Sequence, residues 1–92
     1  MILVTGGSGL VGKHLKDVLP NAVYISSRDF DLMDLNRVDD MMAFFKPKIV
    51  IHLAARVGNL FDNMTYPVDY LEQNITMSSN VLRKCHEYNV ER

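Results

Sequence analysis

The fold of this chain is decided by its first residues, Ile2-Leu3-Val4-Thr5-Gly6-Gly7-Ser8-Gly9-Leu10-Val11-Gly12. A short apolar run leads directly into glycines with the spacing Gly6-x-x-Gly9-x-x-Gly12, and a helical pattern follows. The backbone N–H groups of such a turn and the N-terminus of the next helix both favour negative charge. One glycine is expected to adopt positive φ, one to let a ligand approach the backbone, and one to pack helix against strand. The stretch therefore predicts a cradle for the pyrophosphate of a dinucleotide.

A second phosphate-binding motif, the P-loop, fits part of the same stretch. Gly7-x-x-x-x-Gly12-Lys13 matches most of that motif. The P-loop continues with Ser or Thr, whose hydroxyl binds Mg²⁺, whereas this chain has His14. The dinucleotide interpretation is therefore favoured over the P-loop.

Strand and helix patterns alternate along the rest of the chain. Helical spacing of apolar residues continues from Leu10 and Val11 to Leu19, and Pro20 ends that helix. Residues 22–25 predict a second strand, and residues 49–53 give the strongest strand signal of the chain. This order indicates the α/β class: a Rossmann-like parallel sheet with helices on both faces, incomplete, with about three to four strands. Residues 1–92 are interpreted as the N-terminal part of one NAD(P)-binding Rossmann domain.

Two further helices are expected after the second and third strands. Asn36 is expected to cap the first of them, and Pro47 to close it. Its apolar face would comprise Val38, Met41, Met42 and Phe45, and its Met and Phe residues are expected in the core. A long helix after Pro67 would carry its apolar stripe at helical spacing: Leu71, Ile75, Ser78, Leu82 and Cys85.

Composition limits the class of protein and its partners. The 92 residues are 48% hydrophobic and 23% charged, with a net charge of −1, as in ordinary globular domains. Near neutrality without a basic run argues against nucleic acid as a partner. The apolar runs are too short for a membrane span, and the strand-like start does not resemble a signal peptide. A single cysteine, Cys85, fits a reducing compartment, so we expect a cytoplasmic protein without a membrane partner.

The choice between NAD and NADP depends on the residues after the second strand, Ser26-Ser27-Arg28-Asp29. NAD-binding folds usually place a carboxylate there for the ribose 2′-OH, whereas NADP prefers a cation. Arg28 comes first and favours NADP, with the two serine hydroxyls also able to reach a phosphate. The alternative is a solvated Arg28 paired with Asp29. An Arg–phosphate contact is worth roughly 1.5–3 kcal/mol, or about 10- to 100-fold in cofactor preference.

The third strand ends in His52-Leu53-Ala54-Ala55. Ligands of open α/β sheets lie at such strand ends, and small Ala side chains permit close approach of a cofactor; tight packing of strand on helix is the other interpretation. We expect His52 to be a hydrogen-bonded structural histidine rather than a catalytic base. The remaining histidines, His14 and His86, have no ligand-spaced partners, so no metal site is expected. Cys85 is expected in the core rather than as a nucleophile.

Taken together, these motifs resemble the extended short-chain dehydrogenase/reductases. They are the glycine triplet, the segment Ser26-Ser27-Arg28-Asp29-Phe30-Asp31-Leu32, and His52-Leu53-Ala54-Ala55. A more specific motif resembles the GDP-L-fucose synthase family: Ala54-Ala55-Arg56-Val57-Gly58-Asn59-Leu60-Phe61-Asp62-Asn63-Met64-Thr65-Tyr66-Pro67. The continuation from Asp69 to Leu82 resembles the same family, so the resemblance covers essentially the whole chain. One departure is Gly58-Asn59, where the family usually has two glycines.

The resemblance implies an activity, a cofactor and a set of binding residues. The family uses NADPH to epimerise and reduce GDP-4-keto-6-deoxymannose to GDP-fucose. It implies the following contacts to NADP: Gly6, Gly7, Ser8, Gly9, Leu10, Val11 and Gly12 at the pyrophosphate, Arg28 at the 2′-phosphate, Asp31 and Leu32 at adenine, and Leu53, Ala54 and Ala55 along the ribose and the path to the nicotinamide. A related NAD-dependent nucleotide-sugar epimerase or dehydratase, and a non-catalytic NADP-binding module, remain as alternatives.

The resemblance also implies that the catalytic residues lie outside this sequence. In the family, NADPH supplies the hydride, while a catalytic Ser and a Tyr-x-x-x-Lys motif act at the carbonyl. The Tyr donates the proton, the Lys lowers the pKa of that Tyr and holds the ribose, and a C-terminal part binds the nucleotide sugar. No tyrosine here is followed four residues later by lysine, so the chain contains no catalytic residue and is expected to be inactive alone. The next strand would start near residue 90, and the unpaired edge of residues 49–53 leads us to expect a homodimer or poor solubility.

Overall fold

The computed structural model describes residues 1–54 and 67–91. Within them, the strands are β1 (Ile2–Thr5), β2 (Val23–Ile25) and β3 (Ile49–His52), and the helices are α1 (Leu10–Val18), α2 (Leu35–Phe45) and α4 (Pro67–Glu87). The strands form a parallel sheet in the order β2-β1-β3. The expected α/β architecture is therefore confirmed, with the strands close to their predicted bounds. The features expected at Ala55 and at Gly58-Asn59 lie outside the described residues.

The register of the sheet brings the ends of all three strands together. Thr5, the last residue of β1, pairs with Ile25 of β2 and with His52 of β3. Because the strands are parallel, their carboxyl ends meet at one edge of the sheet. In open α/β folds this edge is where ligands bind. The candidate site is therefore placed by strand pairing alone.

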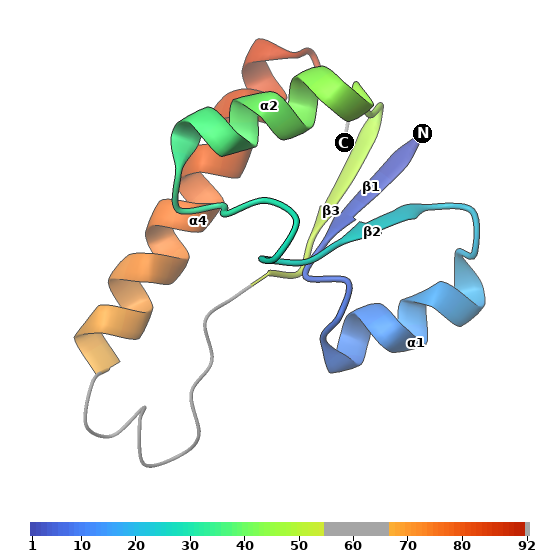
Figure 1. Ribbon diagram of the computed structural model, residues 1–92, viewed down its shortest axis with the longest axis horizontal. Helices are drawn as coiled ribbons and strands as arrows, with labels where there is room; N and C mark the ends of the chain where they lie inside the picture. The colour runs from blue at the N-terminus through green and yellow to red at the C-terminus, as the bar shows by residue number, and fades with distance from the viewer. Residues whose placement is uncertain (55–66, 92) are drawn as a thin grey trace.

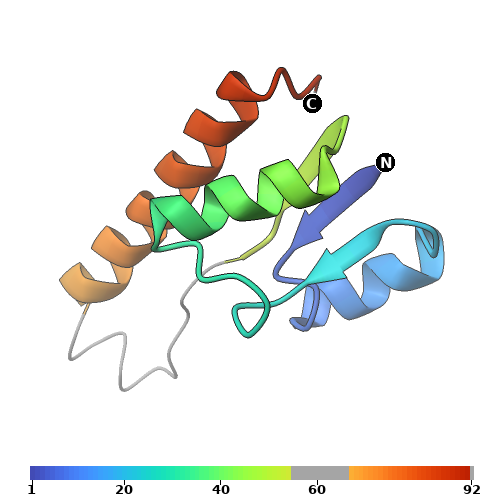
Figure 2. The same cartoon turned by 45° about the horizontal axis from the view of Figure 1, so that its top comes forward.

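Helices α2 and α4 pack side by side, whereas α1 is separated from them by the strands (Figures 1 and 2). The alternation of side chains along β1 explains this layering. Leu3 belongs to the apolar cluster under α2 and α4, whereas its neighbour Val4 is equally buried and lies outside that cluster. The cluster contains Leu3, Ile25, Leu32, Val38, Met41, Met42, Met77 and Val81.

Helix α2 differs from expectation at its start and at one aromatic residue. Asp34 is the N-cap, and its side chain accepts a hydrogen bond from the Asn36 N–H at 3.0 Å, so the prediction that Asn36 caps the helix was wrong. Asp and Asn are equally good caps, and the chain enters the helix two residues earlier than expected. Met41 and Met42 are fully buried as predicted. Phe44 is 77% exposed, because it points away from the face that carries them.

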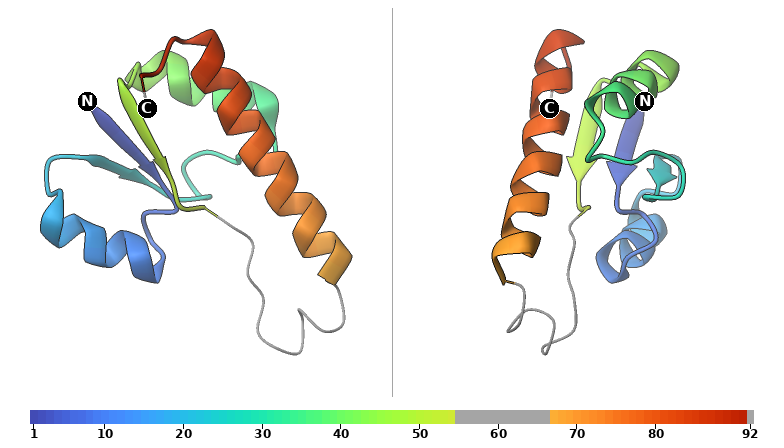
Figure 3. Two further views of the ribbon diagram at one scale, coloured as in Figure 1. Left: turned by 180° about the vertical axis from the view of Figure 1, so that it is seen from behind. Right: turned by 60° about the vertical axis from the view of Figure 1, so that its left-hand side comes forward.

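Helix α4 buries a different face from the predicted stripe. Leu71, Ile75 and Leu82 are 60%, 59% and 71% exposed, whereas Met77 and Val81 are buried. The helix carries apolar residues on two faces, and periodicity cannot determine which of them meets the sheet. The packed face instead contacts α2 and β3 (Figure 3).

Candidate cofactor-binding site

The glycine turn after β1 is closely packed against the neighbouring strands. Gly6 has φ +71°, and a Cβ atom there would lie 2.6 Å from the backbone nitrogen of Ala54. The Gly7 N–H donates to the Ile25 carbonyl at 2.8 Å, which ties the turn to the end of β2. A Cβ on Gly12 would lie 2.7 Å from the Gly7 carbonyl oxygen, so α1 starts directly against the turn. The positive φ and the helix contact expected of the glycines are both present.

The ligand-facing side of the turn is open. A Cβ on Gly9 would meet only the Gly6 carbonyl oxygen, at 3.4 Å. Gly9 is also the N-cap of α1, and no side chain caps the helix. The first-turn N–H groups of a helix have no carbonyl partner within it, and here they are left for an anion. Leu10 and Val11, in that first turn, have exposed side chains. A turn of this kind fits the diphosphate of a dinucleotide.

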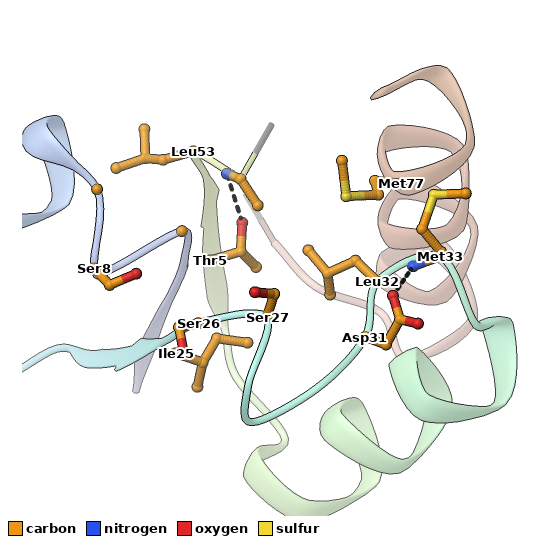
Figure 4. Close-up of a pocket in the computed structure, with 13 residues that line it drawn as sticks. Thr5, Ser8, Ile25, Ser26, Ser27, Asp31, Leu32, Met33, Leu53 and Met77 are labelled. Atoms are coloured by element: carbon orange, nitrogen blue, oxygen red, sulfur yellow. Dashed lines mark hydrogen bonds between the residues drawn. The ribbon is translucent and has the colours of Figure 1, made fainter. Parts of the chain in front are cut away.

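Beside the turn, a cavity of about 210 Å³ opens at the carboxyl ends of the three strands (Figure 4). Its walls come from the strand ends, the glycine turn, the segment after β2 and helix α4: Thr5, Gly6, Ser8, Gly9, Ile25, Ser26, Ser27, Asp31, Leu32, Met33, Leu53, Ala54 and Met77. Pockets for drug-sized ligands measure about 300–1,000 Å³, so the cavity suits one end of a dinucleotide.

The structure brings together part of the predicted binding set. The predicted residues that line the cavity are Gly6, Ser8, Gly9, Asp31, Leu32, Leu53 and Ala54. Those that lie outside its lining are Gly7, Leu10, Val11, Gly12 and Arg28, in the turn, the start of α1 and the segment after β2. Four lining residues, Thr5, Ile25, Met33 and Met77, were not predicted, although Thr5 and Ile25 both end strands at the edge where ligands bind. Met77 belongs to α4, and no sequence motif predicted that it would line the cavity.

The segment after β2 leaves Arg28 available for an anion. The Asp29 carboxylate accepts hydrogen bonds from the Ser26 N–H at 2.8 Å and from the Ser26 hydroxyl at 3.4 Å. The Arg28 N–H donates to the Ser26 hydroxyl oxygen at 3.3 Å. Among the ion pairs of the described residues, none joins Arg28 to Asp29. Asp29 therefore stabilises the turn, and the exposed Arg28 remains beside the cavity edge formed by Ser26 and Ser27.

His52 connects the floor of the cavity to α4. Its Nδ1 lies 2.7 Å from the Thr5 hydroxyl, and its Nε2 lies 3.3 Å from the Ser78 hydroxyl. The Ala54 N–H donates to the same Thr5 oxygen at 3.3 Å. Burial lowers the pKa of His52, and either tautomer of the neutral ring satisfies both hydroxyls. The hydrogen bonds expected of His52 are therefore present on both ring nitrogens.

The sequence also singled out Cys85 and possible metal ligands. Cys85 is half-buried against the core, as expected, and burial raises the pKa of its thiol. Within residues 1–54 and 67–91, no three His, Cys, Asp or Glu side chains are grouped so that they could hold a metal ion. In the same part of the chain, no helix is both long and apolar enough to cross a membrane.

The chain belongs to the NAD dependent epimerase/dehydratase family, whose model matches residues 2–92. Among curated relatives, it is 44% identical to the GDP-L-fucose synthase of Dictyostelium discoideum over 97% of the chain. It spans 30% of that relative's length.

Two solved structures extend the comparison. A GDP-L-fucose synthetase from Naegleria fowleri bound to NADP matches 97% of this chain and 30% of its own, with a TM-score of 0.79 and 38% identity. A UDP-glucose 4-epimerase from Thermus thermophilus in complex with NAD matches 97% of this chain and 34% of its own, with a TM-score of 0.83 and 27% identity. Both support the Rossmann-like interpretation of the fold.

Proposed function

We propose that this chain is the NADP-binding part of a nucleotide-sugar epimerase/reductase of the GDP-L-fucose synthase kind, acting on GDP-4-keto-6-deoxymannose. The observation that carries the proposal is the junction of an open glycine turn, an uncapped helix N-terminus and a cavity at the carboxyl ends of the strands. The similarity to GDP-L-fucose synthases, one of them bound to NADP, supports the choice of cofactor and substrate class.

The test of this proposal is the preference of the chain for NADPH over NADH. Arg28→Ala should weaken NADPH binding by about 10- to 100-fold and leave NADH binding unchanged, because only NADPH carries the 2′-phosphate. Arg83→Ala, which removes an exposed arginine of α4, is the matched control for charge. Dissociation constants come from calorimetric titration. An unchanged NADPH/NADH affinity ratio in Arg28→Ala would refute the assigned role of Arg28.

The same titration separates the proposal from the NAD-dependent alternative. An enzyme like the NAD-bound UDP-glucose 4-epimerase would bind NADH at least as tightly as NADPH in the unmodified chain. A non-catalytic NADP-binding module would prefer NADPH and would take no part in nucleotide-sugar chemistry. Because the first charged residue after β2 is Arg28 and not a carboxylate, NADPH is favoured over NADH.

We further propose that this polypeptide by itself binds cofactor without reducing a sugar. Hydride transfer to a carbonyl needs a proton donor at the carbonyl oxygen, and no Tyr-x-x-x-Lys occurs in the sequence. The nucleotide sugar would be bound by a C-terminal part, as the resemblance to the GDP-L-fucose synthase family implies. NADPH oxidation in the presence of GDP-4-keto-6-deoxymannose should therefore not exceed the rate without the chain.

For partners, we propose a homodimer. In the described sheet β3 is an edge strand, and the Glu91 N–H donates to the Lys48 carbonyl at 2.8 Å where the chain reaches the start of that edge (Figure 3). The exposed Leu71, Ile75 and Leu82 of α4 add apolar surface that a second copy would cover. Sedimentation velocity at tens of micromolar should give the mass of a dimer, and a clean monomer would contradict this.

The proposed location is the cytoplasm, with no membrane or nucleic-acid partner. The half-buried free thiol of Cys85 is consistent with a reducing compartment. A net charge of −1, without a run of basic residues in the sequence, does not favour binding to the phosphate backbone of a nucleic acid. Fractionation of cells that produce the chain should recover it with soluble cytoplasmic markers.

A further inference from the structure

One wall of the cavity is a stretch of chain without regular secondary structure. Residues 26–34 connect β2 to α2, and within them Asp31, Leu32 and Met33 line the cavity (Figure 4). Leu32 is buried, so the backbone of this wall lies against the core. Backbone carbonyls in such a place need hydrogen-bond partners that helices and strands would otherwise provide.

The carbonyls of this wall are bound by a side chain from α4. The Asn80 side-chain amide donates to the Leu32 carbonyl at 2.9 Å and to the Met33 carbonyl at 3.2 Å. In the part of the chain that the structure describes, no backbone N–H outside the helices and strands donates to either oxygen. Within the wall, the Asp31 carboxylate accepts from the Met33 N–H at 3.0 Å. The wall is thus fixed locally by Asp31 and held to the fold by Asn80.

The backbone of Asn80 belongs to the part of α4 that packs on the core. Its neighbours on that helix, Met77 and Val81, are both buried in the core, and Met77 also lines the cavity. Outward movement of the wall would therefore break the two hydrogen bonds from the Asn80 amide or displace the amide from its place on the packed helix. Through the hydrogen bonds of Asn80, α4 thus fixes the position of residues 31–33 relative to the strand ends. This helix begins more than fifty residues after the glycine turn in the sequence.

We infer that Asn80 is a positioning residue for the adenosine half of the cofactor: its amide fixes the cavity wall formed by residues 31–33. The inference rests on the proposed binding of NADP and adds a residue that touches no cofactor atom itself. The apolar surfaces of Leu32, Met33 and Met77 give this end of the cavity the lining that a purine ring requires. The glycine turn, which would bind the pyrophosphate, lies at the other side of the strand ends.

The test compares three probes on the full chain: NADPH, adenosine 2′,5′-bisphosphate and inorganic pyrophosphate. Asn80→Ala should weaken NADPH and the bisphosphate by about tenfold, the effect of losing two hydrogen bonds of ordinary net strength. Pyrophosphate binding should not change. Ser79→Ala, an exposed neighbour on α4, is the control and should bind all three probes as the unmodified chain does.

A general loss of structure would give a different result. It would weaken all three probes in the same proportion, and that outcome would overturn the inference, as would unchanged affinity for the bisphosphate. Backbone amide exchange supplies a readout that needs no ligand: the Met33 and Asp34 N–H groups should exchange faster in Asn80→Ala, whereas those of β1 should not. If the unmodified chain binds neither NADPH nor the bisphosphate, the proposed function fails, while the exchange result still decides whether Asn80 holds the wall.

Discussion

Replacing Gly12 by alanine has two opposite effects on stability: helix propensity favours the alanine, and packing of the helix against the glycine turn disfavours it. In an ordinary helix, Gly→Ala stabilises by about 0.5–1 kcal/mol. Here the new Cβ would lie 2.7 Å from the Gly7 carbonyl oxygen and 2.8 Å from that of Gly6, both of them backbone atoms. Ordinary contact begins at 3.4 Å, so α1 would have to shift by about 0.7 Å. Overpacking of this kind costs about 1–3 kcal/mol, so after the gain in helix propensity we expect a net loss of up to about 2.5 kcal/mol.

The assay for this prediction is urea unfolding followed by far-UV circular dichroism, with Gly9→Ala as the matched variant. Gly9 has φ −76°, and its Cβ would meet only the Gly6 carbonyl oxygen at 3.4 Å. Gly9→Ala should therefore lose no more than about 1 kcal/mol, the usual effect of a poorer N-cap. It should nevertheless weaken NADPH binding by at least about tenfold, because the methyl group enters the cradle. A Gly12→Ala chain more stable than the unmodified one would refute the packing argument.

Three further predictions concern stability. Burial lowers the pKa of His52 below 6.5, so the unfolded chain binds a proton at a higher pH than the folded chain does. The free energy of unfolding should therefore fall as the pH decreases through 6.5 towards the folded-state pKa of His52. His52→Gln should reduce this fall, which urea titrations at several pH values would measure. Met42→Ala should cost about 2–5 kcal/mol because the side chain is fully buried, whereas Phe44→Ala should change stability by less than about 0.5 kcal/mol because its side chain is exposed. Equal effects of the two substitutions in thermal unfolding would contradict the orientation of α2, in which Met42 faces the core and Phe44 faces solvent. Asp34→Ala should cost about 1 kcal/mol and Asn36→Ala only a few tenths, and the reverse order would restore Asn36 as the cap.

The parts of the fold that could be predicted from sequence are those with strong local signals. A strand followed by Gly6-x-x-Gly9-x-x-Gly12 is compatible with few structures other than a strand–turn–helix unit. The positive φ at Gly6 and the close contact of Gly12 with the turn both disfavour residues that carry a Cβ atom. The continuous apolar run of β3 similarly indicates a parallel strand, and its residues are half-buried because β3 lies at the edge of the described sheet. Strand pairing then places the site without further information.

The parts that could not be predicted depend on contacts between distant segments. Helix α4 carries two apolar faces, and only packing against α2 and β3 decides that Met77 is buried and Leu82 is not. Asn80 reaches Leu32 across 48 residues of sequence, and no local pattern encodes such a contact. The choice of Asp34 over Asn36 as N-cap is a shift of two residues between equally good capping side chains.

The hydrogen bond between Thr5 and His52 has a consequence for the order of events during synthesis. The two residues are 47 positions apart, and the floor of the cavity does not exist until β3 has paired with β1. During synthesis, a chain of which only the glycine turn and β2 have left the ribosome therefore has the turn without the adjoining cavity. A cofactor would bind the chain only after β3 has paired with β1, and its binding would then stabilise the folded chain by mass action. On the proposed binding of NADP, the supply of this cofactor would therefore influence how much newly made chain remains folded.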